Sequence, residues 1–436
     1  MKYMVDWLTR GEQLAEIADI WNRLAGPVPF RRWEWLAGWW RCYGQPNQGR
    51  RRLAVGVVKD PAGEAIGLAP WYIERSAIRG RVLRFLGGDE VCSDHLNLLC
   101  LPGREDEVAE ALAQWLNQGS PDRILREFPP SEDAGQETDW TQANVSPVCG
   151  DKSPIPWDLI ELAYVDADDP TLEIFLRCMA RQGCWIERAP VGHCWVIELP
   201  DTWEAFLQRL SNHRRRRLRQ VGRLFFTTGR AVVHTVRRPE ELPKAMDLLV
   251  QLHRQRRRQL GQPDCFVSSR FETFHRQIAP ELLAAGLLEL HWLEVDGQPT
   301  AAEYHLLGDG TIYVYQSGIA PTAECPSPGE WIYLALVRRA IERGCRYFDL
   351  LRGDEAYKAH WRATPRRLET LWIAAPHLSA GWRYGIYRTG RRVKQWLRRW
   401  LGQENSSQPL SSKEQSGSTD ALPSYELASS ARGENL

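Results

Sequence analysis

Apolar positions recur along the chain with helix-like and strand-like spacing, and they predict a mixed α/β protein. The N-terminal part predicts an entry strand at residues 3–8, helices at 11–24, 32–43 and 104–118, a hairpin at 51–76, and further strands at 81–88 and 95–101. This alternation of helices and strands is typical of helices packed on mixed sheets.

The second half of the chain repeats this pattern. It predicts strands at 195–200, 230–238, 346–351 and 368–374, a three-strand meander at 287–319, and helices at 202–223, 239–260, 270–285 and 329–343. The hairpins LAVGVVKDPAGEAIGLAPWY and HWLEVDGQPTAAEYHLL share a strand, an acidic-Gly turn and a strand that begins with small residues. This weak repeat predicts two related α/β domains, at 1–165 and 166–375. A basic amphipathic helix at 376–402 and a disordered tail at 403–436 follow.

Composition narrows the class of protein. The chain has 436 residues and a formal net charge of +1, which argues against DNA binding through overall charge. None of its ten cysteines forms a CxxC pair or has zinc-ligand spacing, so we expect reduced thiols, no metal and a cytoplasmic location. The first residues lack the apolar segment of a secretory signal, and no apolar stretch approaches the roughly 18–20 residues that span a bilayer.

The best candidate for chemistry is the segment from Tyr313 to Trp361. It predicts a strand, a loop, a helix beginning near Ser327 and a second strand, which ends in the charged sequence RGDEAYKAHW. Such a unit places the helix start and the strand end at one edge of the sheet, where ligands of open α/β sheets collect. The alternative to a ligand site is that RGDEAYKAHW is only a hydrated surface turn.

The sequence SPGEWIYLALVRRAIERGCRYFDLLRGDEAYKAHW resembles the signature of the CelD-like, BioF2-type acetyltransferase domain of the GNAT superfamily. The matching residues are Ser327, Gly329, Gly344, Phe348, Asp349, Leu351, Arg352, Gly353, Asp354, Glu355, Tyr357, Lys358 and Trp361. The likeness is specific at 344–361 and looser over most of residues 20–375. It implies two tandem GNAT-like subdomains, as in Fem-type peptidyltransferases, and transfer of an acyl group to an amine or hydroxyl.

The resemblance also implies roles for individual residues. Asp354 and Glu355 are the candidate bases, Lys358 would polarise the acyl carbonyl or hold a phosphate, and Tyr357 would return a proton to the leaving group. Helical spacing is expected to bring Lys358 next to Asp354. The donor, acetyl-CoA or another acyl-CoA, would lie on the helix start, with Ser327, Gly329, Glu330 and Arg352 as donor-binding residues. Only Gly329 remains of the usual GNAT pyrophosphate loop.

Two predictions concern the acceptor side of this segment. Strand alternation is expected to place Tyr313, Tyr315 and Ser317 on one side and Gln316 on the other, so that Tyr315 and Ser317 contact the substrate. A basic helix at 209–223 adds Arg215 and Arg219 as candidate substrate ligands. This helix holds eight basic residues and no acid, and a polyanion would relieve their repulsion.

Residues 381–402 carry no acid, and Val393, Trp396, Leu397, Trp400 and Leu401 fall on one helical face. The pattern is typical of a helix lying on anionic lipid, and a helix docked on the protein is the alternative. The leading prediction is therefore acetyl transfer to a sugar, an exopolysaccharide or another cell-envelope precursor, at the inner face of the membrane. An aminoacyl-tRNA-dependent transferase and a catalytically silent GNAT-like module in polysaccharide assembly are the alternatives.

Overall fold

The computed structural model describes residues 3–44, 50–117 and 156–404. Its strands form one continuous sheet in the order β1-β2-β3-β4-β6-β13-β7-β12-β11-β10-β9-β8, with β5 paired to β3. The tail predicted at 403–436 lies outside the described residues, except for residues 403 and 404, which end the last helix.

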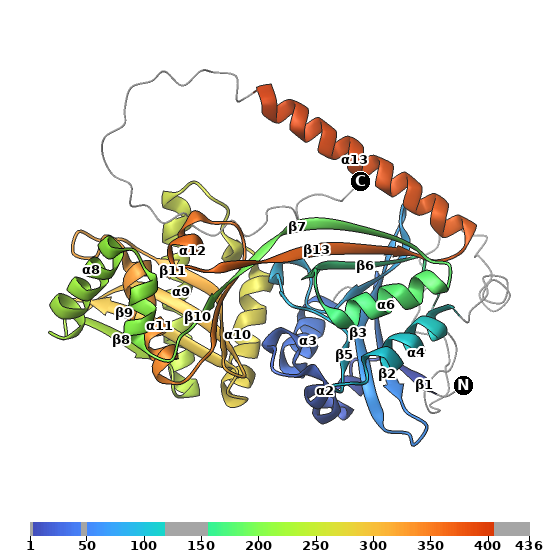
Figure 1. The fold of residues 1–436 in the computed structure, drawn as a ribbon, viewed down its shortest axis with the longest axis horizontal. Helices are drawn as coiled ribbons and strands as arrows, with labels where there is room; N and C mark the ends of the chain where they lie inside the picture. The colour runs from blue at the N-terminus through green and yellow to red at the C-terminus, as the bar shows by residue number, and fades with distance from the viewer. Residues whose placement is uncertain (1–2, 45–49, 118–155, 405–436) are drawn as a thin grey trace.

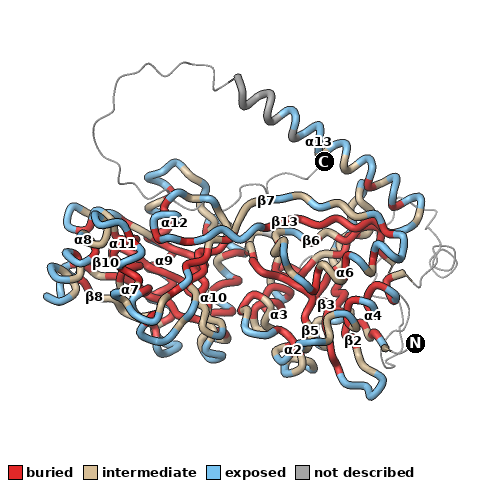
Figure 2. Tube along the Cα trace, in the orientation of Figure 1, coloured by how far each residue is buried: buried red, intermediate tan, exposed pale blue. Residues whose placement is uncertain are grey.

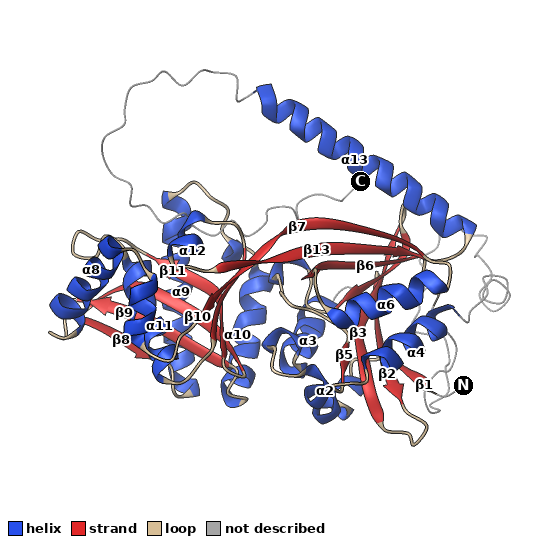
Figure 3. Ribbon diagram, in the orientation of Figure 1, coloured by secondary structure: helices blue, strands red, loops and turns tan. Residues whose placement is uncertain are grey.

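The N-terminal half contributes one end of the sheet and its covering helices (Figure 3). Its strands are β1 (Met4–Leu8), β2 (Arg51–Lys59), β3 (Ala65–Ser76), β4 (Gly80–Phe85), β5 (Leu99–Cys100) and β6 (Leu159–Asp166). Its helices are α1 (Gln13–Glu16), α2 (Ala18–Ala25), α3 (Trp33–Trp39), α4 (Glu105–Asn117) and α6 (Pro170–Arg181). Helix α6 packs on α4, and therefore on this half.

The C-terminal half contributes the other end. Its strands are β7 (Trp185–Glu198), β8 (Ala231–Thr235), β9 (Leu288–Val295), β10 (Gln298–Gly308), β11 (Thr311–Ile319), β12 (Tyr347–Arg352) and β13 (Thr364–Ala374). Its helices are α7 (Trp203–Arg209), α8 (Asn212–Val221), α9 (Leu242–Gln259), α10 (Ser269–Ala284), α11 (Pro328–Glu342) and α12 (Ala356–His360), and α13 (Leu378–Glu404) follows.

The two halves repeat one strand arrangement. In the first half, β1, β2, β3 and β4 are successive antiparallel neighbours, and β4 then pairs in parallel with β6. In the second half, β8, β9, β10 and β11 are antiparallel neighbours, and β11 pairs in parallel with β12. β13 pairs with β6 and β7 pairs with β12, and β7 and β13 run side by side across both halves (Figure 1). The prediction of two tandem GNAT-like subdomains is confirmed.

Two predicted helices are interrupted. The helix expected at 202–223 divides into α7 and α8, because Leu210 is extended and the Ser211 hydroxyl accepts a hydrogen bond from the Arg214 amide and so caps a new helix. The helix expected at 11–24 divides into α1 and α2 at Ile17. The sequence patterns also gave no sign of β6, α6 and the first ten residues of β7.

A continuous hydrophobic core joins the halves, as the buried segments in Figure 2 indicate. Helix α3 packs on α10, where the rings of Trp35 and Phe274 lie 5.2 Å apart. A Cβ at Gly38 would come within 2.5 Å of Ile278, so this close approach requires glycine. A second core, under α11, fills the opposite face of the C-terminal half. The site described below is therefore built on a rigid base.

Among the described residues, no helix is both long and apolar enough to cross a membrane. Helix α13 leaves the end of the sheet and extends away from the body of the protein (Figure 1). The bounds predicted for this helix, 376–402, are close to the observed bounds, Leu378–Glu404.

Candidate active site

Strands β11 and β12 run parallel but are paired only between Thr311–Tyr313 and Tyr347–Asp349. β11 continues to Ile319 and β12 to Arg352, with no further pairing between these two strands in the described part of the chain. An unpaired strand edge offers backbone N–H and C=O groups to an extended ligand. The sheet is therefore open at the end that leads to α11 and to the charged loop.

The charged loop after β12 is held by its own polar groups. Leu351 has a positive φ of 56° and Gly353 one of 113°, which make the chain turn sharply. The Lys358 ammonium is fully buried and donates to the carbonyls of Leu351, Arg352 and Gly353 at 2.9–3.1 Å. It also pairs with Glu355 at 2.9 Å. Lys358 therefore fixes the shape of the loop.

The ion pair of Lys358 is with Glu355, whereas Lys358 interacts with Asp354 through its charge, which helps to lower the pKa of Asp354. The Tyr357 side chain is buried and packs near Tyr333 of α11, with ring centroids 6.5 Å apart. Of the four residues predicted to be catalytic, Asp354 is the exposed one.

Asp354 forms a dyad with His193 of β7. The His193 Nδ1 lies 3.0 Å from Asp354 Oδ1, and the Trp195 indole donates to the same oxygen at 2.9 Å. Partial burial opposes ionisation, but the hydrogen bonds from Trp195 and His193 outweigh it and lower the pKa of Asp354. The side chains of His193 and Asp354 are 39% and 54% exposed. Sequence reasoning missed His193, although it directly precedes a buried strand segment, which begins beside the loop where Cys194 pairs with Arg352.

The start of α11 holds two arginines of α8. Arg217 donates to the Ser327 hydroxyl at 2.8 Å, and the buried Glu330 carboxylate pairs with Arg214 at 3.3 Å and with Arg217 at 3.1 Å. The Ser327 side chain makes no capping hydrogen bond to the helix. Glu330, an acid from another element, therefore offsets part of the positive charge of α8.

The helix start and the charged loop meet at one edge, as the sequence predicts. The Arg214 guanidinium that pairs with Glu330 also lies over the Trp361 ring, 4.6 Å from its centroid. Tyr333 of α11 lies 5.7 Å from Trp361, ring to ring. The first turns of α11 and the segment after β12 are therefore in contact, at the open end of β11 and β12.

Other predicted ligands are engaged elsewhere. Arg352 pairs with the buried Asp94 of the N-terminal half at 3.0 Å and lies over the Tyr164 ring. Arg219 pairs with Glu204 at 2.5 Å, and Arg215 contacts Asn212. Arg215 is therefore engaged within α8 and Arg219 with α7, whereas Arg352 is turned toward the other half.

The predicted side-chain alternation along β11 is wrong. The pairing of β10 with β11 shifts between Tyr304 and His305, so Tyr304 opposes Gln316 whereas His305 opposes Val314. This β-bulge puts Tyr315 and Gln316 on the same side, where Tyr315 donates to the Val91 carbonyl. Ser317 opposes Glu303 and lies on the α11 side. Tyr315 and Ser317 therefore do not share a surface.

Two buried polar residues face α11 from β10, and sequence reasoning missed them. Glu303 and His305 are both fully buried and lie 3.5 Å apart, Oε2 to Nε2. Burial raises the pKa of Glu303 well above its usual value and lowers the pKa of His305 well below it. The polar residues at alternate positions of AAEYHLL, in a strand buried on both faces, are the signal for this pair.

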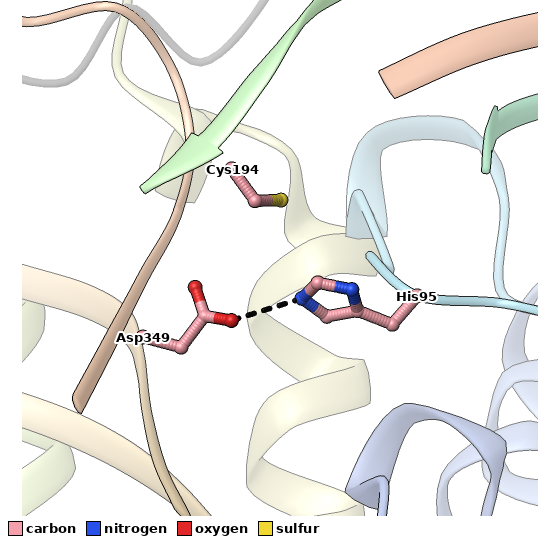
Figure 4. A group of neighbouring side chains, drawn as sticks. All are labelled: His95, Cys194 and Asp349. Atoms are coloured by element: carbon pink, nitrogen blue, oxygen red, sulfur yellow. Dashed lines mark hydrogen bonds and ion pairs between the residues drawn. The ribbon is translucent and has the colours of Figure 1, made fainter. Parts of the chain in front are cut away.

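A buried ionic cluster joins the halves beside the charged loop (Figure 4). His95 lies between two carboxylates, with Nδ1 2.9 Å from Asp166 and Nε2 3.1 Å from Asp349, and the Asp349 carboxylate also accepts from the Leu351 amide. Burial alone would lower the pKa of His95, but the two carboxylates raise it well above the usual value. Cys194 lies beside them, and the ligand atoms of His95, Cys194 and Asp349 are within 4.8 Å of one another. Such groups can hold a metal ion, but here His95 and Asp349 bond to each other.

The pH dependence of stability tests the charge on His95. A histidine with a raised pKa contributes its full stability below the usual pKa of about 6.5 and loses it as the pH rises through the folded-state value. We expect His95→Gln to lower the free energy of unfolding by about 1.5–3 kcal/mol at pH 6, and by less as the pH rises. Denaturant unfolding of both proteins from pH 6 to pH 10 measures this. A difference that stays constant across that range would contradict a charged His95.

Comparisons with known proteins find one family model and several similar solved structures. A family model described as an acetyltransferase (GNAT) domain matches residues 212–359. The structure is similar to one described as FemX, with 10% identity and a TM-score of 0.54, covering 89% of this chain and 99% of that chain. It is also similar to a conserved protein of unknown function from Bacteroides thetaiotaomicron, with 10% identity, a TM-score of 0.48 and coverage of 85% and 100%. No curated protein matches the chain.

The CelD-like resemblance, which depends on the motif at 344–361, stays a prediction. The GNAT match spans α8 to α12 and so includes both the helix start and most of the charged loop. A family model of the GNAT acetyltransferase domain thus matches residues 212–359, and the chain has a fold similar to that of FemX, with two halves that repeat one strand arrangement.

Proposed function

We propose that the protein is an acyltransferase that moves an acetyl group from acetyl-CoA to an amine or hydroxyl of a sugar, a polysaccharide or a cell-envelope precursor. One observation carries this proposal: the start of α11 and the loop after β12 meet at the end where β11 and β12 are no longer paired. This edge combines an open strand, a helix N-terminus and a hydrogen-bonded histidine.

The donor is proposed to bind along this edge. The amides of an extended pantetheine arm suit the unpaired edge of β11, and phosphates suit the first turn of α11 at Ser327 and Gly329. Arg214 and Arg217 are held at that turn by Glu330, so they supply positive charge without having to be ordered by the ligand. Glu330 contributes to donor binding by positioning these two arginines. Arg352 contributes by pairing with Asp94, which holds the charged loop against the N-terminal half.

The transfer step is proposed to use His193 as the general base. Asp354 binds its Nδ1 and thereby orients the ring, which leaves Nε2 for the acceptor, as in other nucleophile-activating pairs. The acceptor N–H or O–H gives its proton to His193 as the new acyl–N or acyl–O bond forms. The acyl–sulfur bond breaks, and the departing thiolate takes up a proton, so that the products are the acylated acceptor and CoA.

The remaining predicted residues have supporting roles in this proposal. Lys358 and Glu355 position the loop, and Tyr357 packs it on α11. Ser317 lies on the α11 side of β11, where it suits the acceptor, as do Arg215 and Arg219 for an anionic acceptor. The nine described cysteines are free thiols, which fits the cytoplasm, where we propose that the protein acts.

Two other functions have an observation in their favour. Exposed basic residues remain on α8, among them His213 and Arg216, and they favour an aminoacyl-tRNA donor. The internal pairing of Arg352, Glu355 and Lys358 favours a silent GNAT-like module, since these groups are already occupied. The same experiment separates all three.

A thermal-shift panel with acetyl-CoA, longer acyl-CoAs, free CoA and aminoacyl-tRNA tests the donor. We expect acetyl-CoA at about 100 times its Kd to stabilise the fold by about 2.7 kcal/mol. Arg217→Gln should weaken this response because it removes a cation from the start of α11. Arg216→Gln, on the same helix but exposed, is the matched control and should behave as the wild type. Stabilisation by aminoacyl-tRNA alone would favour the first alternative, and no stabilisation by any donor would favour the second.

A further inference from the structure

Helix α13 carries an outward apolar stripe, which we define as Leu378, Trp382, Ile386, Val393, Trp396 and Leu397. All six side chains are exposed, and those of Trp382 and Trp396 are 71% and 62% exposed. At about 100° per residue, the six positions span about 100° of the helix circumference. Exposed apolar residues scattered singly need no explanation, but an ordered stripe with two tryptophans indicates a surface that is covered in use.

The stripe is not the face that attaches α13 to the protein. The attached face carries Tyr384, whose ring packs 4.8 Å from Trp185 and whose hydroxyl donates to Glu187. Arg388 pairs with Glu187 at 2.8 Å, and the Arg391 guanidinium lies 3.7 Å from the centroid of Trp372. Docking on β7 and β13 therefore uses the side of the helix opposite to the outward apolar stripe.

Charge indicates what covers the stripe. Residues 378–403 contain seven arginines and lysines and no aspartate or glutamate, in a chain whose formal net charge is only +1. Arg392 and Lys394 are exposed and flank the stripe, about 90° from its centre on one side and about 110° on the other. A second copy of this helix would bring like charges together around an apolar contact. A surface with an apolar interior and anionic groups at its edge complements both features.

We propose that α13 lies flat on a bilayer that contains anionic lipids, with the outward apolar stripe among the acyl chains and the basic residues among the headgroups. Tryptophan favours the boundary between the acyl chains and the headgroups, because its ring is apolar and its indole N–H remains hydrated there. Basic residues beside an apolar stripe are typical of helices that lie in the interface plane. This proposal does not depend on the transfer chemistry.

Flotation of the full chain with lipid vesicles tests whether α13 binds a bilayer that contains anionic lipids. We expect binding to vesicles of phosphatidylcholine and phosphatidylglycerol mixed at about 70:30, and weak binding to vesicles of phosphatidylcholine alone. Trp382→Ser with Trp396→Ser should weaken binding at least about tenfold. Arg392→Gln with Lys394→Gln should weaken it about 30-fold, since each basic residue near an anionic surface contributes a factor of about five.

Matched controls keep the test decisive. Val267→Ser removes an exposed apolar residue far along the chain from α13, and Arg181→Gln with Arg258→Gln removes two exposed charges elsewhere, so neither should change flotation. All variants should keep the wild-type melting temperature because the replaced side chains are exposed. Equal binding to neutral and anionic vesicles, or competition by free glycerol phosphate alone, would overturn the proposal. So would dimers in solution that depend on Trp382 and Trp396, without vesicle binding.

Discussion

Replacing His193 by Gln is expected to lower kcat for acyl transfer by about 10²–10⁴-fold while leaving the donor KM nearly unchanged. The reason is that His193 is held by Asp354 at its Nδ1 and has no role at the start of α11, where we propose the donor phosphates bind. Asp354→Asn should also lower kcat, because the amide no longer fixes the orientation and protonation of the ring. Steady-state kinetics with saturating donor measures both effects.

The charged loop offers a matched control for this prediction. His360 is also exposed and closes α12, but it is not part of the dyad, so His360→Gln should retain full activity. Trp195→Phe removes the indole hydrogen bond to Asp354 and should have a smaller effect than loss of His193. Wild-type kcat in His193→Gln would contradict the assignment of His193 as the base.

The second large effect concerns stability. Lys358→Met is expected to lower the free energy of unfolding by about 3–5 kcal/mol, because it leaves the Glu355 carboxylate and three loop carbonyls without their buried donor. Denaturant unfolding of the two proteins measures the difference. Activity should fall together with stability, since the loop that presents Asp354 loses its support.

A double variant separates two causes of the lost stability: the unpaired Glu355 carboxylate and the loop carbonyls that lose their donor. Lys358→Met combined with Glu355→Met removes the buried carboxylate as well as its partner, and it should recover part of the lost stability. If Lys358 instead touched the substrate, Lys358→Met would lose turnover at nearly wild-type stability. That result would restore Lys358 to the catalytic role that the resemblance implies.

Much of the fold is predictable because local patterns agree with it. The meander at 287–319 and the helix at 329–343 have strong periodicity and the meander has acidic-Gly turns, and the structure has both within a few residues. The interruption at Leu210 follows from Ser211, which is a good N-cap but also occurs inside helices. The first part of β7 lacks alternation because that stretch has little burial on either side.

The site is less predictable, because its contacts join residues that are far apart in the chain. The motif FDLLRGDEAYK places Asp349, Arg352 and Asp354 correctly at the end of a strand. Their partners His95, Asp94 and His193 come from other segments, and no spacing in the sequence connects them. The β-bulge at Tyr315 is equally hidden, because a single extra residue reverses which side chains face α11.

The charged segment after β12 therefore has two parts. Asp349, Arg352, Glu355 and Lys358 form buried or half-buried pairs that join the halves and fix the turn at Leu351. Asp354 remains exposed, together with His193. We infer that the internal pairs give the loop a rigid shape, and that the exposed dyad does the chemistry.

Release of free CoA thiol from acetyl-CoA, measured with a panel of amino and hydroxy sugars as acceptors, tests the proposed transfer most directly. We predict thiol release by the wild type that depends on an acceptor, and its near loss in Asp354→Asn, which should still be stabilised by acetyl-CoA. Acetyl-CoA binding without thiol release for any acceptor, or equal release by Asp354→Asn, would contradict it.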